Sequence, residues 1–179
     1  MCAWTGGAGR SAGTSTSGDT GTWAQPVRFE QSRYDDAGVA ALIEDLQQEY
    51  VERYGSRDES EVDADEFAPP GGLFLLGLVD GEVVAMGGWR AHGDGVVEIK
   101  RMYVLASARR LGYARSMLTE IERTATESGA RSIVLNTGKQ QPEAVALYES
   151  AGYTPIPGYG YYLDAPQALF YGKELPTLE

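Results

Sequence analysis

Residues 100–115 read KRMYVLASARRLGYAR and carry five of the fifteen Lys and Arg residues of the chain, with no Asp or Glu among them. The pattern predicts an apolar strand, a short basic loop, and a glycine that opens a helix. A loop that leads into a helix presents unpaired backbone N–H groups and the positive end of the helix dipole. Gly112 allows the backbone to approach a bulky anion, and Arg109 adds a forked, permanently charged donor. The stretch therefore predicts a binding site for a diphosphate group.

Two other interpretations of this basic loop have to be compared with the diphosphate site. Solvated surface charge is one, because charge patterning alone is a weak signal. The strand–loop–helix position, with Gly112 and the small Ala114 at the turn, favours the anion site. The second interpretation is one of the known nucleotide-binding loops, and the sequence fits neither of the two common types. Gly112 is not part of a Gly-x-Gly-x-x-Gly set after the first strand, and the chain has no Gly-Lys-Ser/Thr sequence.

The composition limits the classes of function. With 179 residues, 42% of them hydrophobic, the chain has the size and apolar content of one domain with a real core. A net charge of −11 argues against a duplex nucleic acid partner, and no apolar run approaches a membrane span. Cys2 is the only cysteine and His92 the only histidine, which leaves little material for disulfides or a metal site. We expect a cytoplasmic monomer or homodimer that binds no nucleic acid, membrane or metal.

The chain divides into a leader and one domain. Residues 1–24 are rich in Gly, Ser and Thr and lack the apolar stretch of a secretion signal, so we expect a flexible leader. Residues 25–179 are expected to form the domain. Its expected elements are a strand at 27–30, a helix from 35 or 36 to about 55, strands at 73–79, 82–89 and 96–104, a helix from 114 to about 129, a strand at 132–136, a helix at 142–152, and strands around 159–163 and 168–171. This order predicts a mixed α/β domain with a single sheet and helices on both faces.

Three motifs in this order are similar to those of the GNAT superfamily of N-acetyltransferases, over about residues 26–175. Residues 109–114 fit the Arg-x-x-Gly-x-Ala form of the family's Q/R-x-x-G-x-G/A loop, Asn136 ends the next strand, and residues 146–153 read ALYESAGY. Each motif alone is common, and their order and spacing are specific. The resemblance implies an α+β fold with a mostly antiparallel sheet of about seven strands, splayed at its centre.

The resemblance also implies acetyl-CoA as the cosubstrate. In the family, the pantetheine arm enters the gap between the two splayed strands, and a strand edge freed from its neighbour does offer unpaired N–H and C=O groups. The loop departs from the family's commonest form at Ala106, Arg110 and Ala114. The residues expected to contact the cofactor are Met102, Tyr103, Val104, Arg109, Arg110, Leu111, Gly112, Tyr113, Ala114, Arg115 and Asn136.

Acetyl transfer to an amine needs a proton acceptor, a donor to the developing oxyanion and an acid for the departing thiolate. The resemblance implies Tyr148 as the acid, and a phenol can protonate a thiolate whose conjugate acid has a pKa of about 8.5. A backbone N–H near Met102 or Tyr103 would hold the oxyanion. Glu98 is the candidate base, since some family members place a glutamate there. Two alternatives stay open: Tyr148 as an ordinary core residue, and Glu98 as a strand carboxylate paired with Lys100 or Arg101, with water relaying the proton.

The acceptor is expected to lie opposite the cofactor, between the first long helix and the last strands. Aromatic side chains in this region are candidate contacts, although ordinary packing is the alternative for each of them. The candidate acceptor contacts are Trp89, Tyr159 and Tyr161, with Glu49, Tyr50 and Tyr162 as further possibilities.

The sequence therefore predicts an N-acetyltransferase that moves an acetyl group directly from acetyl-CoA to a primary amine of a small molecule or peptide. A covalent acetyl-cysteine intermediate is not expected, because Cys2 lies in the leader. The alternative is a non-catalytic sensor or scaffold that binds acyl-CoA with the same fold. The presence of Tyr148 and Asn136 argues against that alternative.

Overall fold

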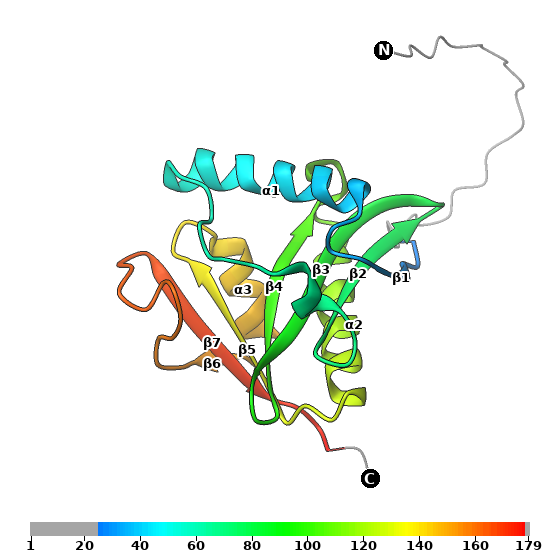
Figure 1. Ribbon diagram of the computed structural model, residues 1–179. Helices are drawn as coiled ribbons and strands as arrows, with labels where there is room; N and C mark the ends of the chain where they lie inside the picture. Colours follow the sequence, from blue (N-terminus) through cyan, green and yellow to red (C-terminus); the bar gives the residue numbers. More distant parts are fainter. Residues whose placement is uncertain (1–24, 178–179) are drawn as a thin grey trace, which may run out of the picture.

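The computed structural model describes residues 25–177, which form one seven-stranded sheet with helices on both of its faces (Figure 1). The predicted leader, residues 1–24, lies outside the described residues. The sheet order is β1-β2-β3-β4-β5-β7-β6, and every neighbouring pair is antiparallel except β4 and β5. The elements are β1 (Arg28–Ser32), α1 (Ala37–Tyr54), η1 (Ala64–Phe67), β2 (Gly72–Val79), β3 (Glu82–Gly93), β4 (Val96–Val104), η2 (Ala106–Ala108), α2 (Tyr113–Glu127), β5 (Ser132–Gly138), α3 (Pro142–Ser150), β6 (Thr154–Pro155) and β7 (Ala168–Glu174).

Two hydrophobic clusters hold the helices against opposite faces of the sheet. On one face, α2 packs Met117, Leu118 and Ile121 against strand side chains, and α3 adds Tyr148. On the other face, α1 and η1 pack residues such as Leu46 against β2 and β3. Because side chains alternate along a strand, β2 and β3 each contribute to both clusters. The predicted mixed sheet with helices on both faces is confirmed.

The sheet opens between β4 and β5. These parallel strands pair only over Val96–Glu98 and Ser132–Val134, and beyond these residues they diverge (Figure 1). Their C-terminal halves therefore have no sheet partner on the side that faces the gap. The predicted central splay is present, and it leaves backbone groups and side chains available to a ligand.

A β-bulge lies in β4 where the strands diverge. Gly88 pairs with Lys100 and Met86 pairs with Tyr103, so Arg101 and Met102 both lie opposite a single residue of β3. Arg101 has a φ of 55°, in the left-handed region. Bulges bend a strand and re-aim its side chains, and this one directs β4 away from β5.

The end of the chain differs from the prediction. The expected strand at 159–163 is wrong, because the short strand β6 lies earlier and residues 156–167 form a connecting loop. Pro157 and Gly160 explain the loop: proline donates no ladder hydrogen bond, and Gly160 has a left-handed φ of 64°. Across residues 25–177, none of the helices has the length and apolarity that a bilayer crossing requires.

Candidate active site

A cavity of about 1000 Å³, here named the main cleft, occupies the gap between β4 and β5. Helices α1, α2 and α3 close its sides. Ten of the eleven residues predicted to contact a cofactor line it: Met102, Tyr103, Val104, Arg109, Arg110, Gly112, Tyr113, Ala114, Arg115 and Asn136. Leu111 does not line the cleft and is exposed. The fold thus gathers into one cavity residues that the sequence places on three separate segments.

The loop between β4 and α2, here named the cradle, lies at one end of the main cleft, where the sequence predicts an anion site. Within residues 25–177, no hydrogen-bond acceptor faces any backbone N–H from Arg110 to Arg115. Gly112 is the N-cap of α2, has a φ of 85°, and provides no side-chain cap. Six unpaired N–H groups at a helix start therefore point to an oxygen-rich anion.

The Arg109 side chain already has partners inside the cleft. Its Nε donates to the Val104 carbonyl at 3.1 Å, its guanidinium pairs with Glu49 of α1, and its Cζ lies 5.6 Å from the centre of the Tyr103 ring. The predicted cofactor residues of β4 and of the loop are thus fixed to one another by this arginine. A phosphate approaching Arg109 would have to share the guanidinium with Glu49.

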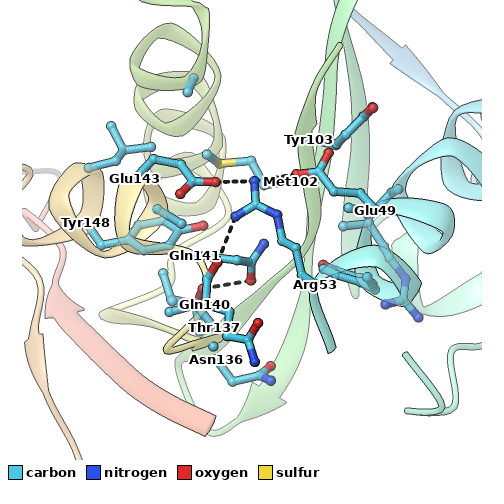
Figure 2. Close-up of a pocket in the computed structure, with 18 of the residues that line it drawn as sticks. Glu49, Arg53, Met102, Tyr103, Asn136, Thr137, Gln140, Gln141, Glu143 and Tyr148 are labelled. Atoms are coloured by element: carbon cyan, nitrogen blue, oxygen red, sulfur yellow. Dashed lines mark hydrogen bonds and ion pairs between the residues drawn. The ribbon is translucent and has the colours of Figure 1, made fainter. Parts of the chain in front are cut away.

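An arginine that the sequence did not single out bridges the main cleft. Arg53 extends from α1 and pairs with Glu49 at 2.8 Å and with Glu143 of α3 at 2.5 Å (Figure 2). It also donates to the Gln140 carbonyl at 2.9 Å. The Glu49–Arg53 spacing of four residues is a detectable helix signal. The partners Gln140 and Glu143, which lie about ninety residues further along, are decided by the fold.

Tyr148 lies on α3 with its ring buried beside Tyr153, 5.6 Å between ring centres, and it lines the main cleft (Figure 2). Burial raises the pKa of its phenol to about 12. The hydroxyl therefore keeps its proton at neutral pH and makes no hydrogen bond within the described residues. This geometry suits an acid that donates a proton into the cleft.

A second cavity, here named the side pocket, opens on the α1 face of the sheet and has a volume of about 570 Å³. Lys100, Asn136 and Tyr162 line both cavities, so the side pocket joins the main cleft beside them. Its lining residues are Glu59, Ser60, Glu61, Arg90, His92, Glu98, Lys100, Asn136, Tyr159, Gly160, Tyr161 and Tyr162.

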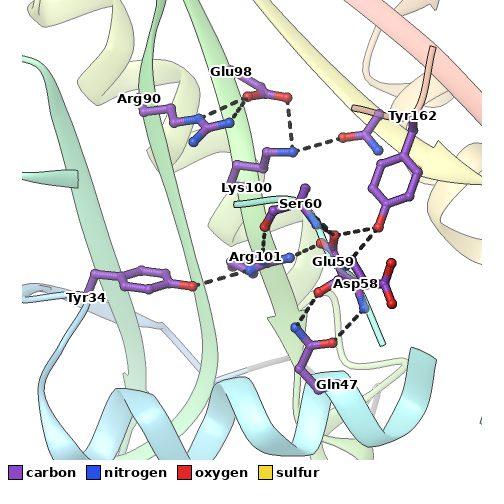
Figure 3. Close-up of polar contacts among 11 residues, drawn as sticks. Tyr34, Gln47, Asp58, Glu59, Ser60, Arg90, Glu98, Lys100, Arg101 and Tyr162 are labelled. Atoms are coloured by element: carbon purple, nitrogen blue, oxygen red, sulfur yellow. Dashed lines mark hydrogen bonds and ion pairs between the residues drawn. The ribbon is translucent and has the colours of Figure 1, made fainter. Parts of the chain in front are cut away.

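The floor of the side pocket holds a buried charge cluster (Figure 3). Glu98 contacts Arg90 at 3.0 Å through one carboxylate oxygen and Lys100 at 3.2 Å through the other. Lys100 also donates to Asn136 Oδ1 at 3.3 Å. With both oxygens facing cations, Glu98 has the paired environment that the sequence left open as an alternative to a catalytic base. Of the two partners that this alternative named, Lys100 contacts Glu98 and Arg101 does not; Arg90 is a further partner.

Arg101 instead fastens the β4 bulge to two loops. Its guanidinium pairs with Asp58, whose carboxylate also accepts from the Tyr162 hydroxyl at 2.7 Å and from the Ser60 hydroxyl at 2.6 Å (Figure 3). Burial alone would raise the pKa of Asp58, but the charge of Arg101 and these hydrogen bonds outweigh it and lower the pKa. The loops that cover the side pocket are thus tied to the strand that lines the main cleft.

The three predicted acceptor contacts have different positions. Tyr159 and Tyr161 line the side pocket, as does Tyr162. Trp89 does not, and that prediction is wrong: its indole Nε1 donates to Thr124 of α2 at 3.0 Å inside the core. The physical reason is strand alternation, which directs Trp89 to the α2 face and its neighbour Arg90 to the side pocket. Arg90 could have been found by applying the same alternation to the sequence.

Comparisons with known proteins agree on one family. A model of the acetyltransferase (GNAT) family matches residues 39–153. An IAA acetyltransferase of Azospirillum brasilense is 32% identical over 146 residues, which cover 81% of this chain and 95% of that protein. Human N-acetylaspartate synthetase is 30% identical over 115 residues, which cover 64% of this chain but only 38% of that protein.

Solved structures share the fold. A candidate acyl-CoA N-acyltransferase from Klebsiella pneumoniae has a TM-score of 0.71 at 26% identity, covering 83% of this chain and 97% of that chain. An acetyltransferase from Bacillus subtilis, determined in complex with CoA, has a TM-score of 0.62 at 16% identity, covering 84% of this chain and all of that chain, 100%. The second likeness concerns the fold alone.

Proposed function

The chain belongs to the acetyltransferase (GNAT) family and is an acyltransferase, and from this premise we propose that it transfers an acetyl group directly from acetyl-CoA to a primary amine. The observation that carries the proposal is the run of unpaired N–H groups from Arg110 to Arg115 at the end of the main cleft. A diphosphate flanked by a long, narrow arm fits a cradle that continues into a gap between strands. The Bacillus subtilis acetyltransferase, which has the same fold, was determined in complex with CoA, and this agrees with the proposal.

Different residues along the main cleft would bind different parts of the cofactor. In the proposal, the loop N–H groups hold the diphosphate, and the free edge of β4 at Met102, Tyr103 and Val104 bonds the pantetheine amides. Asn136 faces the same arm from β5. The cleft volume of about 1000 Å³ lies at the upper end of the range for small-molecule sites, which suits a ligand as large as acetyl-CoA.

The chemistry is nucleophilic addition to a thioester. The neutral amine nitrogen attacks the carbonyl carbon, a C–N bond forms and the C–S bond breaks. One proton leaves the nitrogen and one reaches the sulfur, which yields the N-acetylated amine and the CoA thiol. Tyr148 supplies the proton to sulfur, and a backbone N–H of Met102 or Tyr103 bonds the oxyanion. Because both Glu98 oxygens face cations, we assign the amine proton to water in the joined cavities.

The experiment is an acetyl-CoA turnover assay with a panel of primary amines. Release of free thiol is followed with a thiol-reactive dye, and the acetylated product is identified by mass spectrometry. We expect amine-dependent thiol release by the full chain. Tight binding of acetyl-CoA without turnover of any amine in the panel would overturn the proposed transfer.

A further inference from the structure

The floor of the side pocket carries unused hydrogen-bond donors. An ammonium group has three donors, and the contacts of Lys100 to Glu98 and Asn136 occupy two of them. Lys100 is 8% exposed and lines both cavities, so its third N–H is confined to the junction between them. A buried charge with spare donor capacity is costly unless a ligand or water completes it.

Two further residues, Asn136 and Tyr159, supply donors to the side pocket. Asn136 accepts from Lys100 through Oδ1, which leaves both N–H groups of its amide without an acceptor among residues 25–177. Tyr159 has a buried hydroxyl with no hydrogen-bond partner in that same part of the chain. Burial, followed by the negative charge of nearby Glu98, raises the pKa of this phenol, so it remains a donor. Both residues line the side pocket.

The floor has little left to accept a hydrogen bond. Glu98 is the buried carboxylate there, and its two oxygens already face Arg90 and Lys100. A ligand group that fits must therefore accept several hydrogen bonds and carry negative charge. A carboxylate has two oxygens, no donor when ionised, and forms charge-assisted bonds with lysine.

The position of these donors fixes where the amine must be. Lys100 and Asn136 lie at the junction of the side pocket with the main cleft, where the thioester would be. If the acceptor's carboxylate is bound to Lys100 and Asn136, its amine can face the main cleft only when the amine and the carboxylate are close neighbours in the acceptor molecule. An α-amino acid meets this requirement. A peptide does not, because its first carboxyl group is part of the peptide bond.

The outer part of the side pocket is negatively charged, whereas its floor holds two cations and one carboxylate. Glu59 and Glu61 are exposed lining residues, and Glu59 accepts from the Tyr161 hydroxyl at 3.2 Å. The remainder of the acceptor would extend toward these carboxylates. They disfavour a second negative charge and favour a neutral or basic side chain.

We propose that the acceptor is a free α-amino acid, with its carboxylate bonded by Lys100, Asn136 and Tyr159 and its amine facing the main cleft. This inference rests on the proposed acetyl transfer and names its substrate class. The acidic outer part makes neutral and basic amino acids better acceptors than acidic ones.

The test compares matched acceptors in the turnover assay. L-phenylalanine, L-methionine, L-glutamine and L-lysine are each measured beside their α-carboxamide and their decarboxylated amine. For those that react, we expect kcat/KM of the acid to exceed that of either analogue by about tenfold or more, because a charge-assisted contact is lost. The inference would be overturned if the analogues react as well as the acids. It would also be overturned if only amines that are not α-amino acids react. No turnover of any amine would instead overturn the proposed function.

Variants connect the preference to named donors. Lys100→Met should bring the acid-to-carboxamide ratio close to one, and Tyr159→Phe should lower it about threefold to tenfold. Lys173→Met is the matched control, because Lys173 pairs with Glu122 and lines neither cavity. Its ratio should equal that of the unaltered chain. Tyr159→Phe removes no hydrogen bond within the described residues, so it decides the question if Lys100→Met does not fold. A ratio unchanged in the folded variants would refute the assignment.

Discussion

Replacing Tyr148 by Phe removes one oxygen from the wall of the main cleft, and its effects on stability and on rate should separate. The hydroxyl makes no hydrogen bond within residues 25–177, and the effect of burial alone raises its pKa. No partner is left unsatisfied by the substitution, so the free energy of unfolding should change by no more than about 0.5 kcal/mol. The ring and its contact with Tyr153 remain.

The rate should fall because the departing thiolate loses its acid. General acid catalysis contributes about a hundredfold to ten-thousandfold, so we expect kcat to decrease by about a hundredfold or more, which corresponds to about 2.7 kcal/mol. The Tyr148 phenol, with a pKa of about 12, is only about 1% ionised at pH 10. The activity of the unaltered chain should therefore show no loss from Tyr148 ionisation between pH 7 and pH 10. Acetyl-CoA affinity should be unchanged in the variant.

The assay measures initial rates of thiol release at saturating substrates, with acetyl-CoA binding by calorimetry and thermal unfolding alongside. Tyr153→Phe is the matched control: Tyr153 is the neighbouring buried tyrosine, its hydroxyl also lacks a partner among the described residues, and it lines neither cavity. Its kcat should be unchanged. Equal kcat in Tyr148→Phe and the unaltered chain, or an equal decrease in both variants, would refute the assignment of Tyr148 as the acid.

Three further predictions concern the cradle and the bulge. Arg109→Ala should weaken acetyl-CoA binding about tenfold by calorimetry, and unchanged affinity would exclude its side chain from the phosphate site. Gly112→Val adds a β-branched side chain at a φ of 85°, which costs about 1–2 kcal/mol and should displace the loop, so that acetyl-CoA binding also weakens. Asp58→Asn leaves the buried Arg101 unpaired and should lower the free energy of unfolding in urea by about 3 kcal/mol. Since the pKa of Asp58 is lowered in the fold, this difference should hold above about pH 4, the unfolded value, and shrink as the pH falls below it.

Local patterns in the sequence were sufficient for most of the fold. The strands predicted at 73–79 and 82–89 and the glycine that opens a helix at position 112 depend on a few neighbouring residues, and the structure has all of them. Asp80 and Gly81, which join the two strands, have left-handed φ angles of 51° and 86°. The cradle was predictable for the same reason, because it consists of backbone groups at one helix start. The conformation of residues 159–163 was not predictable in this way. Their aromatic residues are typical of a strand, but a glycine and contacts with another loop hold the segment as a loop.

Long-range pairing limited the prediction of the site. Arg53 reaches a partner on α3, and Arg101 pairs with Asp58 of a distant loop. In the sequence, nothing distinguishes Arg53, Arg101 or Asp58 from charged residues on the surface. Their partners depend on which faces of α1, β4 and the loops come together, and this depends on burial over the whole domain.

The sequence by itself determined most of the secondary structure, the loop that we propose binds phosphate and the tyrosine on α3 that we propose as the acid, because each depends on the chemistry and spacing of adjacent residues. The tertiary structure alone decided that β4 leaves β5 after Glu98, that Glu98 is enclosed by Arg90 and Lys100, and that the resulting pocket is rich in donors. Charge pairing in a buried site depends on distances through space, and segments far apart in the chain acquire those distances only when the sheet and its helices pack together.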